Sequence, residues 1–124
     1  MSKPSPVDLE TLPGYHIRRL QQIAVAIFLQ ETEACGLTPV QYAALQMVAN
    51  APGLDQRTLA RSVGVDTSTL AGVIDRLEVR GLVLRNAAPD DRRVRRLTLT
   101  DAGRELLHEV RPGMQRAQER MQIG

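Results

Sequence analysis

Four arginines fall within residues 92–96, directly after two aspartates. Arginine supplies every basic side chain of the protein except Lys3. The guanidinium ion is planar, stays charged at physiological pH and holds phosphate or carboxylate groups through paired hydrogen bonds. Residues 57–96 carry nine basic and five acidic side chains, whereas residues 1–56 carry three and five. The middle third of the chain is therefore expected to bind a polyanion.

A row of hydroxyl groups, Thr67, Ser68 and Thr69, lies in the same third of the chain. It follows Asp66, a residue type that commonly caps the start of a helix. The first amides of a helix have no partner within it, and hydroxyls beside them can bind the same phosphate. Arg76, further along the same predicted helix, could reach a phosphate or the edge of a base. Plain helix capping is the simpler interpretation of these side chains, and it is compatible with phosphate binding.

Composition argues against several other classes of protein. The 124 residues suit one domain, and with only 2% aromatic residues a stacking surface for single-stranded nucleic acid is not expected, so duplex DNA is the better candidate. The sequence has no phosphate-binding loop, no H-E-x-x-H and no G-x-S-x-G motif, so we expect neither an enzyme nor a cofactor. Cys35 is the single cysteine, which excludes an intrachain disulfide and a thiolate zinc site, and no metal is expected. The longest apolar run, residues 23–29, is too short to span a membrane, and we expect a cytoplasmic protein with no membrane partner.

The first helix is predicted from Pro13 to about Ala34, because proline favours the first helical position and apolar residues recur at helical spacing. Residues 1–12 contain two prolines and no periodic pattern, and are expected to form a flexible arm. Between residues 23 and 29 the helix is apolar on all sides, and such a helix must be covered all round. We therefore expect a second copy of the chain to cover part of it, in a homodimer. Burial by the rest of the same chain is the alternative.

Three further helices are predicted up to Gly81. The sequence T-P-V-Q at residues 38–41 has the pattern of a capping box, and its helix would end at the Pro-Gly pair at 52–53. Asp55 caps a second, short helix that stops at the next glycine. Asp66 caps the third after a very short turn.

The hydrophobic period changes after the third of these helices. Residues 82–85 and 94–99 are short runs of β-favouring residues around a polar loop, which predicts a hairpin with a basic tip. A last helix is predicted to begin after Thr100, with apolar residues at steps of three and four. Pro112 is expected to kink or split that helix, because proline removes one backbone hydrogen bond.

Two helices joined by a tight turn and followed by a basic hairpin predict a winged helix-turn-helix. The expected fold is mainly α with a small β-hairpin wing, in which dimerisation helices at residues 13–36 and 101–124 flank a DNA-binding lobe at 37–100. The second helix of the motif would enter the major groove and the wing would reach the minor groove. The candidate DNA-binding residues are Arg57, Thr67, Ser68, Thr69, Arg76, Asp91, Arg92, Arg93 and Arg95, with Asp91 orienting an arginine. A helical hairpin that does not bind DNA, a winged helix used for protein contacts and a solvated run of charges are the alternatives.

Between Leu37 and Gly103 the sequence carries, in this order, T-P-x-Q-Y, L-A-x-x-x-G-V, R-L-E-x-R-G-L-V-x-R, P-x-D-R-R and L-x-L-T-x-x-G. In these motifs the stretch resembles the MarR family of winged-helix regulators. The resemblance implies a homodimer formed by the first and last helices on a near-palindromic operator. It also implies that Asp91 and Arg93 shape the wing. Family members often carry larger or polar side chains where this chain has Ala71 and Gly72, so sequence readout is expected to depend more on the wing and on DNA shape.

The same resemblance implies a repressor released by a small aromatic acid. The candidate ligand-binding residues are His16, Arg18, Arg19 and Tyr42, since arginine pairs with a carboxylate through two hydrogen bonds. Solvated arginines and a Tyr42 that only packs against Leu37 are the alternatives. A regulator that responds to no ligand, or to oxidation of Cys35, is also left open, although no basic residue lies near Cys35 in the sequence to activate its thiol.

Overall fold

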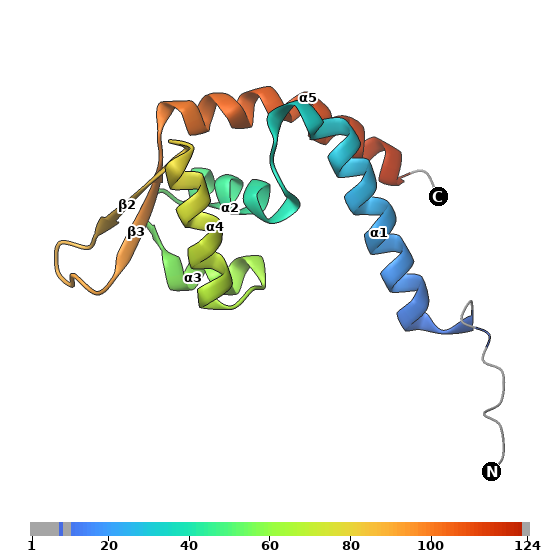
Figure 1. Ribbon diagram of the computed structural model, residues 1–124, viewed down its shortest axis with the longest axis horizontal. Helices are drawn as coiled ribbons and strands as arrows, with labels where there is room; N and C mark the ends of the chain where they lie inside the picture. Colours follow the sequence, from blue (N-terminus) through green and yellow to red (C-terminus); the bar gives the residue numbers. More distant parts are fainter. Residues whose placement is uncertain (1–7, 9–10, 123–124) are drawn as a thin grey trace, which may run out of the picture.

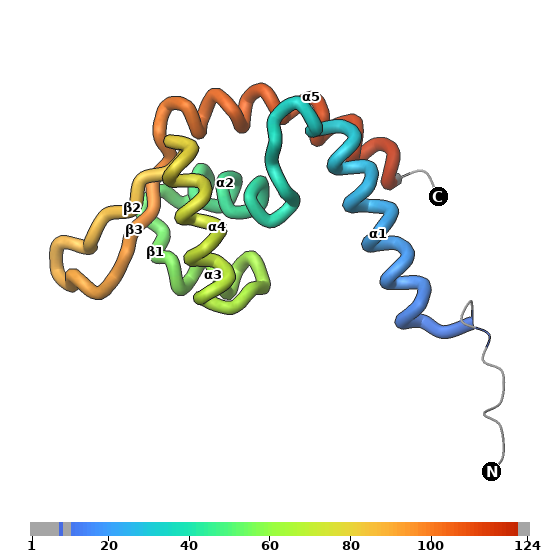
Figure 2. The backbone as a smooth tube through the Cα atoms, viewed as in Figure 1, coloured from blue at the N-terminus to red at the C-terminus, as the bar shows by residue number. Residues whose placement is uncertain are grey.

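The computed structural model describes residue 8 and residues 11–122, and most of the predicted arm at 1–12 lies outside these residues. The elements are α1 (Pro13–Thr32), the 3-10 turn η2 (Glu33–Cys35), α2 (Pro39–Asn50), β1 (Leu54–Asp55), α3 (Gln56–Val63), α4 (Thr67–Val79), β2 (Val83–Ala87), β3 (Arg95–Leu99) and α5 (Asp101–Gln122). The strands form one antiparallel sheet in the order β1-β3-β2, drawn in Figures 1 and 2. The expected fold class, mainly α with a small hairpin wing, is confirmed.

Side-chain caps begin the helices of the lobe as the sequence predicts. Thr38 accepts a hydrogen bond from the amide of Gln41 at 3.1 Å, and the Gln41 side chain accepts one from the amide of Thr38 at 3.1 Å, which completes the capping box of α2. Asp55 caps α3 and Asp66 caps α4 through the backbone amide three residues later. Gly64 ends α3 with φ of 84°, a left-handed conformation that favours glycine, so the turn to α4 can be very short.

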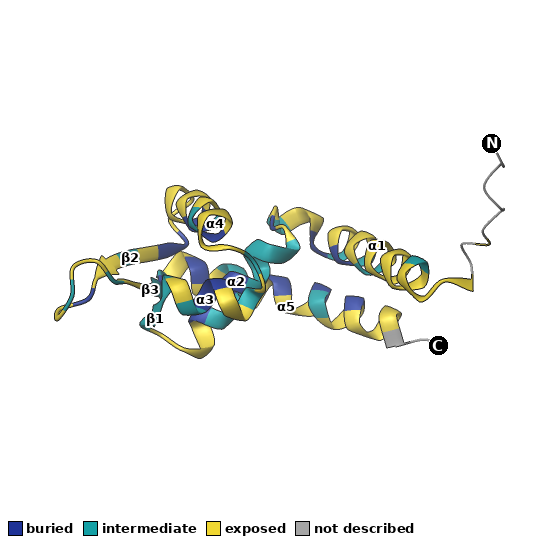
Figure 3. Cartoon of the chain, turned by 90° about the horizontal axis from the view of Figure 1, so that it is seen from below, coloured by how far each residue is buried: buried dark blue, intermediate teal, exposed yellow. Residues whose placement is uncertain are grey.

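The core of the lobe lies where α2, α3 and α4 meet the sheet. Leu45, Leu59, Leu70, Ile74 and Leu97 are fully buried there. They come from α2, α3, α4 and β3, so each element contributes an apolar face to one cluster. Figure 3 shows that the buried residues are concentrated in the lobe, whereas most residues along α1 are exposed.

Helix α5 leaves the sheet and crosses α1, which packs against it (Figure 1). At the crossing, a Cβ atom on Gly113 would lie 2.4 Å from the carbonyl oxygen of Glu31, so only glycine allows this approach. Arg116 and Arg120 close the contact by pairing with the Glu31 carboxylate at 2.6 and 3.2 Å. The crossing joins the N- and C-terminal helices into one layer beside the lobe.

Several sequence predictions were wrong in detail. Of the two expected effects of Pro112, a kink or a split of the last helix, the split is wrong, because α5 runs through the proline as one helix. Helix α1 ends at Thr32 rather than Ala34, and a 3-10 turn follows. The wing strands begin one residue later than predicted, and the first extends to Ala87. The two-residue strand β1 was not predicted, because two residues cannot show a period.

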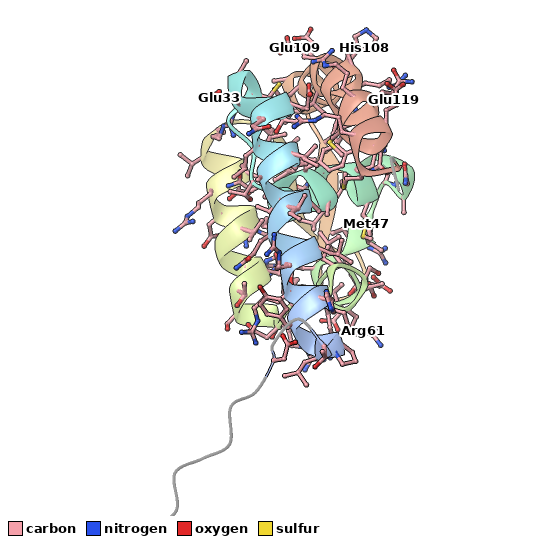
Figure 4. All side chains as sticks on the ribbon, turned by 90° about the vertical axis from the view of Figure 1, so that its right-hand side faces the viewer. Glu33, Met47, Arg61, His108, Glu109 and Glu119 are labelled. Atoms are coloured by element: carbon pink, nitrogen blue, oxygen red, sulfur yellow. The ribbon has the colours of Figure 1, made fainter. Side chains whose placement is uncertain are left out.

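Helix α1 presents apolar side chains that no described part of this chain covers. Ile17 and Leu20 are 65% and 66% exposed, and Ile23 and Leu29 are exposed as well. Phe28 and Thr32, near the end of the helix, are buried against the rest of the protein. Figure 4 looks onto α1 in front of the lobe, with Arg61 near one end of the view and Glu33 near the other. Ile23 and Leu29 belong to the apolar stretch 23–29, so the alternative that this chain alone buries that stretch fails.

Candidate nucleic-acid interface

A cleft of about 540 Å³ lies between the start of α4, the start of α3 and the wing. It brings together residues from three separate stretches of sequence: Asp55, Gln56, Arg57, Thr67, Asp91, Arg93, Val94 and Arg95. Five of the nine predicted DNA-binding residues line it. Three of those five are arginines, which makes the cleft suited to a phosphate backbone.

The wing tip is shaped by Asp91. Its carboxylate accepts a hydrogen bond from the amide of Arg93 at 3.0 Å and another from the Arg93 guanidinium at 3.2 Å. The backbone of the turn is closed by Val94, whose amide donates to the carbonyl of Asp91 at 3.1 Å. Hydrogen bonds from Arg93, first from its amide, lower the pKa of Asp91, so this carboxylate stays charged. The expected pairing of Asp91 with a wing arginine is present.

The start of α4 shows which hydroxyl could serve a phosphate. Asp66 accepts hydrogen bonds from the hydroxyls of Ser68 at 2.7 Å and Thr69 at 3.0 Å, and from the amide of Thr69 at 2.7 Å. These bonds, the amide of Thr69 foremost, lower the pKa of Asp66. The protons of Ser68 and Thr69 are therefore committed to the cap. Thr67 lines the cleft, so its hydroxyl is the best placed of the three to donate to a phosphate.

Two predicted DNA-binding arginines lie outside the cleft. Arg76, on α4, and Arg92, in the wing, are both exposed but do not line the cleft. The Arg95 guanidinium donates to the carbonyl of Arg92 at 2.6 Å, which ties the two wing arginines together. Nothing within 4 Å would meet a Cβ atom on Gly72, so this part of α4 is open.

Sequence reasoning missed Asp55, Gln56 and Val94 as residues of the cleft, although it predicted Asp55 as a helix cap. Gln56 is the first residue of α3, directly after the capping Asp55, so the position of the cap could have indicated it. Hydrogen bonds from Thr58, first from its hydroxyl, lower the pKa of Asp55. Val94 could not have been distinguished from the other apolar residues of the predicted strand.

A second cavity of about 390 Å³ lies between α2 and α5. It is lined by Tyr42, Gln46, Leu107, Arg111, Met114, Gln115, Gln118 and Glu119. Of the predicted ligand-binding residues, Tyr42 lines this cavity, whereas His16, Arg18 and Arg19 lie in the first half of α1 and do not. The cation that sequence reasoning missed here is Arg111, and its signal is the helical spacing of residues 107, 111, 114 and 118 on α5.

The other predicted ligand residues have local contacts of their own. The ring of His16 meets the edge of Tyr15, with ring centroids 5.8 Å apart. The Arg19 guanidinium donates to the Tyr15 hydroxyl at 3.4 Å. Within one chain the structure thus does not bring these residues to Tyr42. His108 lies on the outer side of α5 (Figure 4) and is exposed.

Residue 8 and residues 11–122 were also compared with what a metal site, a membrane span and a disulfide require. In that part of the chain no three His, Cys, Asp or Glu side chains are grouped to hold a metal ion. No single helix there has the length and apolar composition of a membrane span, although α1 with η2 and α2, bent by 70°, pass that test as a pair. Cys35 is a free cysteine of intermediate exposure.

Sequence comparison relates the chain to known regulators. The MarR family profile matches residues 37–94. A transcriptional regulatory protein for the hcr operon of Thauera aromatica is 38% identical over 104 residues, which are 83% of this chain and 63% of that protein. The transcriptional repressor NicR of Pseudomonas putida KT2440 is 32% identical over 108 residues, which are 87% of this chain and 68% of that protein. The chain thus spans less than two thirds of the first of these relatives.

Solved structures agree with this relationship over nearly the whole chain. The repressor CouR bound to a 23-mer DNA duplex superposes with a TM-score of 0.89 at 32% identity, covering 98% of this chain and 87% of that one. BpsR of Bordetella bronchiseptica, whose DNA binding is regulated by 6-hydroxynicotinic acid, gives a TM-score of 0.89 at 30% identity, covering 97% and 86%. These proteins are named as regulators and not as enzymes, as expected from the sequence. The chain belongs to the MarR family.

Proposed function

We propose that this protein is a transcriptional regulator that binds duplex DNA as a homodimer. The observation that carries the proposal is the cleft at the start of α4, which Arg57, Arg93 and Arg95 line together with the hydroxyl residue Thr67. Arginines and hydroxyls around a helix start can bind several phosphates at once and so fix the protein on the duplex. Helix α4 is then placed to read bases from its exposed side.

The dimer is supported by the exposed apolar face of α1. Ile17, Leu20 and Ile23 are exposed on α1, and they would lose their contact with water against the same residues of a second copy. A two-fold dimer presents two recognition helices, which suits a near-palindromic site with half-sites about 34 Å apart. The dimer contact is thus proposed to set the spacing at which DNA is read.

The effector is proposed to be a small aromatic carboxylic acid that releases the protein, acting as a repressor, from its operator. The cavity between α2 and α5 is within the size range of ligand sites, and it places Arg111 and Tyr42 around the apolar Leu107 and Met114. Arginine pairs with a carboxylate, and the apolar side chains suit an aromatic ring. Through α2 the cavity borders the lobe, and through α5 it borders the layer of α1 and α5 that is proposed to form the dimer. His16, Arg18 and Arg19 remain candidates if a second copy brings its own α1 near this cavity.

DNA binding is tested by fluorescence anisotropy with the DNA upstream of the protein's own gene and a mixed-sequence duplex. We expect tighter binding to the upstream DNA and a steep fall of log affinity with log salt, in proportion to the phosphates neutralised. Equal, salt-independent binding of both duplexes, or none, would remove the proposed function.

The effector is tested by adding benzoate or 6-hydroxynicotinate to the complex with upstream DNA. Release by an aromatic carboxylate is expected, at higher ligand concentration for Arg111→Met than for the wild type. Arg104→Met is the matched control, since Arg104 lies on α5 outside the cavity and pairs with Asp101 of its own helix. If Arg111→Met and Arg104→Met respond alike, the cavity is not the effector site.

A further inference from the structure

Arg85 joins three elements of the DNA-binding lobe through one guanidinium group. It lies in β2, where its Cα pairs with that of Leu97 in β3. One nitrogen donates to the carboxylates of Asp75 and Glu78 on α4, the second of these at 3.3 Å. The other nitrogen donates to the side-chain oxygen of Gln56, the first residue of α3, at 3.3 Å. The base of the wing is thereby tied both to the recognition helix and to the helix before it.

The alternation of side chains along β2 explains why Arg85 reaches α4. Val83 is buried in the core and Leu84 is exposed, so Arg85, two residues after Val83, points to the same side of the sheet as Val83. The side chain of Arg85 is only 19% exposed. By comparison, the wing arginine Arg93 is 91% exposed. Arg85 is therefore placed in the seam between wing and helix and not on the surface that faces DNA.

Arginine is the residue type that this arrangement requires. Its planar fork offers donors on two nitrogens that point in different directions, and here they reach different helices. A lysine carries all its donors on one nitrogen and could not hold both sets of partners in the same geometry. Both acceptors on α4 are carboxylates, so the bonds to that helix are of the charge-assisted kind.

The partners of Arg85 stand beside residues that the proposed function uses. Asp75 precedes Arg76 on α4, and Gln56 precedes Arg57 and lines the cleft. A shift of the wing against α4 would change the distance between Arg93 and Thr67 across that cleft. Without Arg85, the carboxylates of Asp75 and Glu78 on α4 would also lose their guanidinium partner, close to the phosphates of the proposed bound DNA.

We propose that Arg85 is a positioning residue for DNA recognition, which fixes the angle between the wing and the recognition helix without touching DNA itself. The proposal rests on the proposed function. The proposal predicts that loss of Arg85 changes discrimination between duplexes but not the salt dependence of binding. Loss of Arg85 reduces discrimination between a specific and a mixed-sequence duplex, because the wing and α4 no longer fit their two grooves together. The salt dependence of binding stays unchanged, because no phosphate contact is lost.

The test uses the full chain and two duplexes: one selected by the wild-type protein from a random pool, and one of mixed sequence. Affinities are measured over a range of salt for the wild type, Arg85→Met, Arg85→Lys and the control Arg104→Met. The triple variant Arg85→Met/Asp75→Asn/Glu78→Gln separates charge from position, because it removes the uncompensated carboxylates but does not restore the link. Thermal unfolding confirms that each variant is folded, and Arg85→Lys provides the milder change should Arg85→Met not fold.

For Arg85→Met we expect about a tenfold loss of discrimination, the scale of one charged hydrogen bond, with the salt slope of the wild type. The discrimination of Arg85→Lys should lie between that of the wild type and that of Arg85→Met. The triple variant should discriminate no better than Arg85→Met, and Arg104→Met should discriminate as well as the wild type. Wild-type discrimination in Arg85→Met and Arg85→Lys overturns the inference. Recovery of wild-type discrimination in the triple variant also overturns it, because it indicates a role of charge alone. A salt slope lower by about one in Arg85→Met overturns it as well, because it indicates direct contact of Arg85 with a phosphate. If the wild type binds neither duplex, the proposed function fails as well, and that outcome is distinct from the others.

Discussion

A single carboxylate oxygen of Asp91 accepts two hydrogen bonds from Arg93, one from its backbone amide at 3.0 Å and one from its guanidinium Nε at 3.2 Å. The pair holds the wing turn and the direction of the arginine at the same time. The remaining donors of the guanidinium still face solvent, because the Arg93 side chain is 91% exposed. An arginine held in this way loses little conformational freedom when it meets a phosphate.

Removal of the Arg93 side chain tests the wing. Arg93→Ala should weaken binding to duplex DNA and lower the slope of log affinity against log salt by about 0.9, the value for one phosphate contact. Asp91→Asn keeps the arginine and should weaken binding with less effect on the slope. Anisotropy titrations at several salt concentrations measure both quantities, and Arg104→Ala serves as control. Wild-type affinity and slope in Arg93→Ala would exclude the wing from DNA binding.

The exposed face of α1 gives a prediction about assembly. Leu20→Glu places a charge in the proposed dimer contact, where burying it without a partner is costly, so the dimer should dissociate to monomers. Val79→Glu is the matched control, because Val79 is 88% exposed at the far end of α4. Sedimentation equilibrium distinguishes the two. A dimer that persists in Leu20→Glu with the wild-type dissociation constant would place the interface elsewhere.

The close approach of α5 to α1 gives a prediction about stability. Gly113→Ala would force a Cβ atom against the carbonyl of Glu31, and overpacking of this kind costs about 1–3 kcal/mol in the free energy of unfolding. Gly72→Ala lies in an open part of α4 and should stabilise by up to about 1 kcal/mol, since alanine favours a helix more than glycine does. Urea unfolding of both variants measures the difference. Equal effects of the same sign would mean that the α1–α5 crossing is looser than described.

Local signals in the sequence predicted the lobe well. The capping box of Thr38 and Gln41 and the cap by Asp66 involve residues three apart, and such contacts follow from helix geometry alone. The close approach of Gly113 to Glu31 joins residues far apart in the sequence, so no local pattern predicted it. Pro112 predicted a kink or a split of the last helix, and α5 is not split.

The candidate sites show the same difference between contacts within a short segment, which the sequence predicts, and contacts between distant segments, which it does not. The hydroxyls after Asp66 and the arginines of the wing lie in short segments whose spacing predicted a common surface, and five of the predicted DNA-binding residues share the cleft. The link from Arg85 to Gln56 was not predicted, because it depends on how β2 packs across two helices. The predicted ligand residues on α1 were grouped by chemistry, and their distance from Tyr42 is set by the direction of α1, which no local pattern contains.

Acid should weaken the cap of α3. The hydroxyl and amide of Thr58 lower the pKa of Asp55 below its ordinary value of 3.8 in the folded protein. A carboxyl with a depressed folded-state pKa contributes stability that is present above its unfolded value and is lost as pH falls through the folded value. In the variant Asp55→Asn, the asparagine would still cap the helix but would not titrate. The wild type should therefore lose stability relative to Asp55→Asn as pH falls below about 3.8.

Urea unfolding at pH 7 and at pH 3 measures this change. The free energy of unfolding of the wild type minus that of Asp55→Asn should be smaller at the lower pH. A difference that is the same at both pH values would mean that Asp55 is not held by Thr58 in the folded protein.

The central claim is that duplex DNA is held between the start of α4 and the wing. Amide chemical shifts of the isotopically labelled protein, followed by NMR as duplex DNA is added at low salt, test it most directly. The account predicts that the largest changes fall on residues 67–69 and 91–95, with small changes over the first half of α1. Changes concentrated on α1 and α5, with those two segments unaffected, would contradict it.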